Sequence, residues 1–101
     1  MSRWFRVYDE AVNDPKVQRL QPHLFKAWFN ILCLANKAGN GVLPPVSDIA
    51  FALRMSDTDA QSAVEELILV GLIDIAPNKT LSPHNWAALQ APSDNSKQRT
   101  K

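Results

Sequence analysis

The segment that follows Pro22 has the clearest helical pattern in this chain of 101 residues. Proline is well suited to the first turn of a helix, and apolar residues then recur at spacings of three and four. They are Leu24, Phe25, Trp28, Ile31, Leu32 and Ala35. Residues 39–41 (Gly-Asn-Gly) end the pattern, and Pro44 and Pro45 delay the next helix. Any fold of this chain therefore has to be built around this helix.

Two shorter helices are predicted after the proline pair. Ser47 is expected to cap a helix that reaches Arg54, and Ser56 or Asp57 to cap a second helix that reaches about Val70. Apolar residues on one face of each helix are expected to pack against the first helix. They are Ile49, Ala50, Leu53, Ala60, Val64, Leu67 and Ile68.

A short β-hairpin is predicted immediately after these helices. Gly71 is expected to end the second helix in a left-handed conformation. Residues 72–75 and 80–82 then have strand character and are separated by a Pro-Asn-Lys turn, and Leu72, Ile73 and Ile75 are expected to complete the core. A helix pair followed by a hairpin is the order of a winged helix-turn-helix. We therefore expect a mainly α (α+β) fold with four to six helices and a two-stranded wing.

The flanking segments are expected to cover this core. Residues 3–8 alternate as in an edge strand or an extended arm. Residues 9–20 indicate a helical turn, a break at Asp14 and Pro15, and a second short helix. Residues 83–90 indicate a last short helix whose Trp86 covers the open side of the core. We expect one domain over residues 1–90, with residues 91–101 a disordered tail or linker.

Composition limits the class of protein. With 46% hydrophobic residues the chain can build one core. It has neither a run of about 20 apolar residues that would span a bilayer nor the apolar run of a signal peptide, so we expect a cytoplasmic location and no membrane partner. The single cysteine, Cys33, lies in an apolar run and is expected to act as a small core hydrophobe.

Charge is distributed unevenly along the chain. Residues 1–37 carry six basic against three acidic side chains, residues 38–78 one against six, and the remainder four against one. An anionic partner is therefore expected to meet the N-terminal segment, the wing or the tail rather than the middle of the chain.

The second helix of a helix-turn-helix normally enters the major groove of DNA. Its exposed positions here are Thr58, Gln61 and Ser62, which can bond to base edges. The same helix carries four acidic side chains and no Lys or Arg, and such a face suits solvent better than phosphates. Contacts to the phosphate backbone or the minor groove are therefore the favoured mode. The candidates for them are Arg54, Lys79, Arg3 and Arg6.

A second hypothesis is a module for protein interaction or self-association without direct DNA binding. A domain this small cannot easily bury all of its aromatic residues, and Phe29, Phe51 and Trp4 are the candidate interface residues. Burial under the N-terminal arm is the alternative for them.

Enzymatic chemistry finds little support in the sequence. His23 and His84 are far apart and lack ligand partners, and each of the three glycines serves a turn or a helix end. We expect no catalytic residue, no metal, no cofactor and no small-molecule substrate.

Five short motifs together resemble a known family. They are residues 4–8 (Trp-Phe-Arg-Val-Tyr), 16–20 (Lys-Val-Gln-Arg-Leu), 53–56 (Leu-Arg-Met-Ser), 66–73 (Glu-Leu to Gly-Leu-Ile) and 83–86 (Pro-His-Asn-Trp). Over residues 3–90 the chain looks like the N-terminal winged-helix domain of phage replisome-organiser and DnaD-like replication proteins. The resemblance implies one domain of a longer replication-initiation protein, implicated in DNA binding or self-association, with residues 91–101 beginning its linker.

Overall fold

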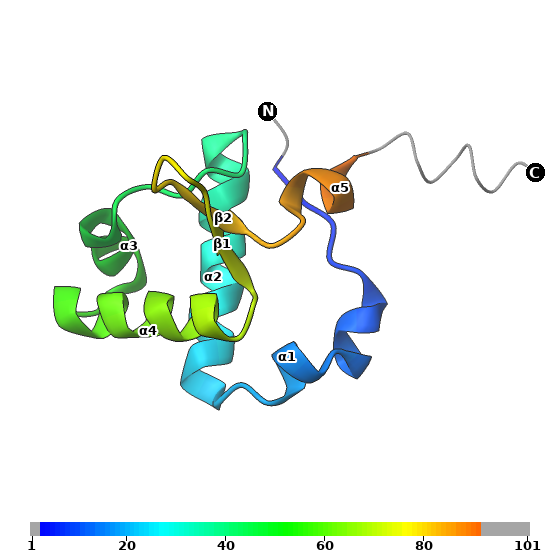
Figure 1. Ribbon diagram of the computed structural model, residues 1–101, viewed down its shortest axis with the longest axis horizontal. Helices are drawn as coiled ribbons and strands as arrows, with labels where there is room; N and C mark the ends of the chain where they lie inside the picture. Colours follow the sequence, from blue (N-terminus) through cyan, green and yellow to red (C-terminus); the bar gives the residue numbers. More distant parts are fainter. Residues whose placement is uncertain (1–2, 92–101) are drawn as a thin grey trace, which may run out of the picture.

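Helix α2, Pro22–Ala38, is the central element of the computed structural model, which describes residues 3–91. Helices α3 and α4 pack on one side of it and the N-terminal segment and α5 on the other (Figure 1). Its buried stripe confirms the predicted pattern except at Phe25, which is 45% exposed and lies beside the Trp28 ring with 5.6 Å between ring centroids. Phe25 falls at the edge of the apolar stripe, so its ring is only partly covered. The helix ends at Gly39, whose φ is 88°.

The predicted helix-turn-helix is confirmed as α3, Val46–Leu53, and α4, Asp57–Leu69. Ser47 is not the cap that the sequence suggests, because α3 begins at Val46 and Pro45 occupies the N-cap position without a side-chain hydrogen bond. The φ of −56° and ψ of 155° at Pro45 already place the chain for a helix start. Ser56 does cap α4, since its Oγ accepts a hydrogen bond from the backbone N–H of Asp59 at 3.0 Å.

This difference between the two serines is testable. Replacing Ser56 by alanine is expected to lower the free energy of unfolding by about 1 kcal/mol, because one N–H at the start of α4 loses its acceptor. Ser47→Ala is the matched control and is expected to change stability by less than about 0.5 kcal/mol. Urea unfolding of both variants measures the two values, and equal losses would contradict the assignment.

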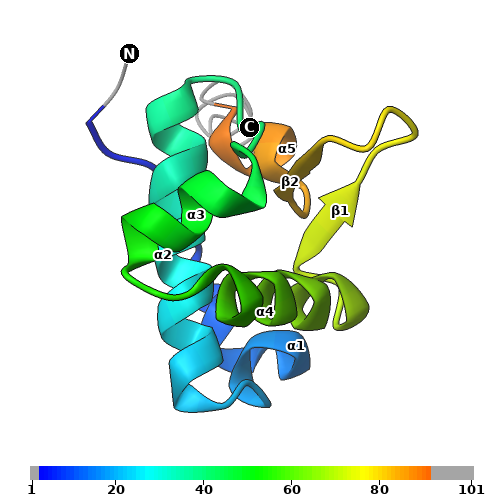
Figure 2. The same ribbon diagram turned by 90° about the vertical axis from the view of Figure 1, so that its left-hand side faces the viewer.

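The predicted wing is confirmed as an antiparallel pair of strands, β1 (Ile73–Ile75) and β2 (Leu81–Pro83). The return strand begins and ends one residue later than the sequence suggests, so Pro83 belongs to the hairpin. Ile73 is fully buried, but Ile75 is 52% exposed, and its predicted place in the core is wrong. Figure 2 shows the reason: the hairpin extends beyond the body of the domain, so Ile75 has left the core that Ile73 fills.

The segments at the two ends form the remaining side of the domain. A 3-10 helix η1, Asp9–Asn13, and helix α1, Pro15–Gln18, confirm the predicted break between two short helical pieces. Helix α5, Trp86–Gln90, follows the wing. Residues 3–8 are extended and pair with no strand of the described part of the chain, so they form an arm and not an edge strand.

Three further expectations have mixed outcomes. Cys33 is half-buried, so it is only partly the core residue that was expected. Apart from Ala91, the predicted tail lies outside the described residues. Within residues 3–91, none of the helices has both the length and the apolar character needed to span a bilayer.

Candidate functional site

The structure brings the three predicted base-reading residues together on the exposed face of α4. Thr58, Gln61 and Ser62 border a shallow depression between α4 and the start of α3. Gln61 Nε2 donates a hydrogen bond to Glu65 Oε2 at 2.8 Å, so its amide is already engaged on the helix. Leu69 continues this face at helical spacing and is 83% exposed. The face therefore combines polar, acidic and apolar groups.

The electrostatics of this face oppose phosphate binding. Asp57 and Glu65 border the same depression, and Asp59 and Glu66 are exposed on the same helix. No Lys or Arg lies on α4 to offset these charges. A phosphate backbone laid against α4 would therefore be repelled.

Arg54 is the C-cap residue of α3 and has a left-handed backbone with φ 61°. Its Nη1 donates to the carbonyl oxygens of Phe51 and Ala52 at 3.0 and 3.2 Å. The guanidinium also lies over the Phe51 ring, 5.9 Å from the centroid. Arg54 therefore caps its own helix, which reduces its suitability as a phosphate contact.

Arg6 is bound to α5 through Gln90. The backbone N–H of Arg6 donates to Gln90 Oε1 at 2.8 Å, its Nη1 donates to the Gln90 carbonyl at 2.9 Å, and Gln90 Nε2 donates to the Arg6 carbonyl at 2.9 Å. The Arg6 guanidinium also lies 5.3 Å from the centroid of the Trp4 ring. We call this pair of residues the terminal clasp. It fixes the arm to the end of the fold.

Lys79 and Arg3 lie away from α4. Lys79 is exposed in the wing turn, and Arg3 is exposed at the start of the described arm. In Figure 2 the arm, the end of α2 and the wing tip all lie above α4, but the arm and the wing tip are on opposite sides of the domain. Lys37 lies in the last turn of α2, and residues 39–45 that follow contain no acid. We call Arg3, Lys37 and Lys79 the basic end.

The candidate interface residues belong to two different parts of the surface. Phe29 is partly covered by the arm, because its ring lies 6.2 Å from that of Phe5. Trp4 is in the same arm. Phe51, in contrast, is 80% exposed on α3. The structure therefore leaves Phe51 as the least covered of the three rings.

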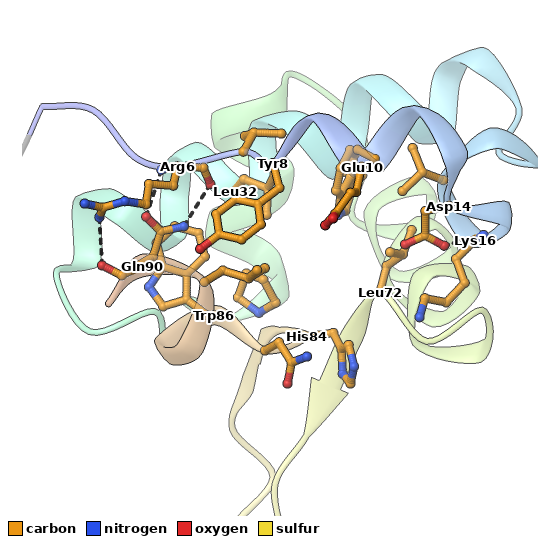
Figure 3. A pocket seen from close by; sticks show the side chains of 17 residues that line it. Arg6, Tyr8, Glu10, Asp14, Lys16, Leu32, Leu72, His84, Trp86 and Gln90 are labelled. Carbon is orange, nitrogen blue, oxygen red and sulfur yellow. Dashed lines mark hydrogen bonds between the residues drawn. The ribbon is translucent and has the colours of Figure 1, made fainter. Parts of the chain in front are cut away.

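A cavity of about 260 Å³ opens between residues 6–17 and residues 83–90 (Figure 3). Trp28 and Leu32 of α2 and Leu72 form its buried floor, and Trp86 and Leu89 of α5 line one side. Sequence reasoning missed this site, because its two walls come from opposite ends of the described chain. Only the expectation that Trp86 covers the core pointed to this side of the domain.

Polar groups surround the mouth of the cavity. Tyr8 and Glu10 extend over it from the arm and η1, and His84 lies on the opposite side (Figure 3). The Nδ1 atom of His84 lies 3.0 Å from Asp74 Oδ1, and Asp14 accepts from the backbone N–H of Lys16 at 2.9 Å. The remaining carboxylate at the mouth is that of Glu10.

Within residues 3–91, no group of three His, Cys, Asp or Glu side chains is arranged so that it could hold a metal ion. The fold is a small winged helix-turn-helix. Comparisons with protein-family models, with curated proteins and with solved structures find no match for this chain.

Proposed function

We propose that this chain is a winged-helix DNA-binding module that contacts phosphates with its basic end and does not insert α4 into the major groove. The observation that carries the proposal is the separation of charge: the arm, the end of α2 and the wing tip carry Arg3, Lys37 and Lys79, and these segments lie apart from the acidic α4 (Figure 2). The resemblance to phage replisome organisers and DnaD-like proteins supports a role in replication initiation. The domain is then non-catalytic.

The wing is the part best placed for this contact. Lys79 lies in a turn fixed by the Lys79 N–H to Ala76 carbonyl hydrogen bond of 2.8 Å. A cation at a wing tip can contact the backbone or enter the minor groove, and a basic arm can do the same. These contacts position a protein on DNA without reading a defined sequence.

Salt-dependent titration of a labelled DNA duplex tests the proposal. Binding is expected to weaken steeply between about 50 and 200 mM salt, because each neutralised phosphate releases counterions. Lys79→Ala and Lys37→Ala are each expected to reduce the slope of log K against log salt by about 1.

Lys26→Ala is the matched control. Lys26 is exposed on α2 about 16 Å from Lys37 along the helix axis, so its loss removes the same charge from the other end of the domain. If all three substitutions have an equal effect, DNA binding depends on the net charge of the domain and not on contacts at the basic end. Absence of binding at low salt would overturn the proposal.

A second candidate function is protein interaction through α3 and α4. It is favoured by the exposure of Leu69 and Phe51, two large apolar side chains on the helix-turn-helix. In this case light scattering is expected to show an oligomer, and Leu69→Glu is expected to convert it to a monomer. DNA binding is expected to be absent. A monomer in light scattering at high concentration would contradict self-association.

A further inference from the structure

We infer that the cavity between the arm and the wing is an anchor site for an aromatic side chain, tryptophan or tyrosine, of a partner polypeptide. This inference goes beyond the proposed contact with DNA, because the cavity and the basic end use different residues. It is carried by the size of the cavity, its aromatic wall and the balanced charge at its mouth.

The size of the cavity fits one aromatic ring. An apolar cavity of about 150 Å³ in another protein is enough to bind benzene, and this cavity measures about 260 Å³. Its floor of Trp28, Leu32 and Leu72 is buried. An indole or phenol ring therefore fits without displacing the core.

Aromatic side chains border the cavity on two sides. Trp86 lines it from α5, and Tyr8 extends over it from the arm (Figure 3). Aromatic rings attract one another in tilted or offset arrangements beyond the gain from burial alone. The terminal clasp holds the arm against α5 and so keeps these two rings in place before any ligand arrives, which lowers the entropic cost of binding.

The mouth of the cavity favours a neutral ligand with one polar edge. Glu10 and Asp14 are balanced there by Lys16 and Arg6. Asp14 and Arg6 have partners within the fold, which leaves the Glu10 carboxylate as the acceptor for an indole N–H or a phenol O–H. A nucleotide gains no net attraction for its phosphates here, because the acidic and basic groups at the mouth balance.

Apolar surface next to the mouth favours a polypeptide over a small molecule. Val7 and Tyr8 line the cavity and are also exposed, and Val12 is exposed on η1 beside the lining residue Ala11. In protein interfaces a ring buried in a pocket is surrounded by weaker contacts that exclude water. A chain that inserts one aromatic residue here covers these valines at the same time.

Titration of the ¹⁵N-labelled chain, followed by NMR at the indole N–H signals of Trp28 and Trp86, tests the inference. The probes are indole, toluene, N-acetyltryptophanamide, a peptide with one Trp between valines, and thymidine monophosphate. We expect saturable shifts with the Trp peptide strongest, then N-acetyltryptophanamide and indole. Tighter binding of thymidine monophosphate would overturn the inference in favour of a nucleobase site. Binding of indole without binding of the two peptide-like probes would overturn the polypeptide partner.

Two substitutions locate the binding and separate it from the proposed DNA contact. Ala11→Phe fills the cavity from η1 and is expected to weaken binding of the Trp peptide at least tenfold. Ala87→Phe is the matched control, because Ala87 is exposed on α5 and does not line the cavity, and it is expected to leave peptide affinity unchanged. Glu10→Gln is expected to weaken indole severalfold and to leave toluene unchanged, which tests the site even if Ala11→Phe unfolds. Ala11→Phe is expected to retain DNA affinity and Lys79→Ala to retain peptide affinity. An equal loss of peptide affinity with Ala11→Phe and Ala87→Phe would contradict the assignment.

Discussion

Replacement of Gly41 by alanine is expected to lower the free energy of unfolding by about 3 kcal/mol. Gly41 has φ 82°, a conformation that costs a residue with a Cβ about 1–2 kcal/mol. A Cβ at this position would also overlap the Trp86 indole, with Cγ and Nε1 both only 2.8 Å away. Overpacking of this kind adds about 1–3 kcal/mol. Denaturant unfolding of the variant measures the loss.

Gly39→Ala separates the two causes. Gly39 has a similar φ of 88°, but it is exposed at the end of α2 and a Cβ there would meet open space. Only the backbone cost remains, and a loss of about 1 kcal/mol is expected. If both variants lose the same free energy of unfolding, the overlap with Trp86 contributes nothing to the loss at Gly41.

Leu67→Ala is expected to lower the free energy of unfolding by about 3 kcal/mol, because the side chain is fully buried and its removal leaves a void. Leu67 lies where α4 packs on the cluster around Ile31, Ile49 and Ile73. The matched control is Leu69→Ala on the same helix, which is 83% exposed and is expected to change stability by less than about 0.5 kcal/mol. Thermal unfolding distinguishes them. A large loss for Leu69→Ala would show that the exposed face of α4 is covered in solution.

Much of the fold follows from local features of the sequence. The spacing of apolar residues predicts α2 and α4, because one face of each helix must be buried. Ser56 and Gly71 give the ends of α4 through chemistry that acts within a few residues. The hairpin follows from two short strand-like runs on either side of a turn.

The predictions that were wrong are those for which the local sequence pattern does not determine the structure. Ile73 and Ile75 share one face of β1, but only Ile73 lies over the core, since burial depends on how far the wing extends past the body. Phe25 fits the helical period, and yet its side chain is 45% exposed. The proline before Val46 starts α3 without help from Ser47. The errors at Ile75 and Phe25 concern tertiary position, the error at Ser47 concerns a helix boundary, and none concerns the type of element.

The candidate sites show the same contrast between features that follow from local sequence and features that depend on tertiary contacts. Exposure of Thr58, Gln61 and Ser62 follows from helical geometry once α4 is predicted. The contacts that engage Arg54 and Arg6 could not be predicted, since Arg54 folds back on its own helix end and Arg6 meets a residue 84 positions away. The cavity depends on that same long-range contact and leaves no local trace in the sequence.

The terminal clasp has a consequence for how the chain folds during its synthesis. Because Arg6 emerges from the ribosome long before Gln90, the arm lacks its partner until nearly all of the described chain has been synthesised. Closing a loop of this length is slow compared with the pairing of neighbouring elements. We therefore expect the helix-turn-helix to form first and the arm to pack on α5 last.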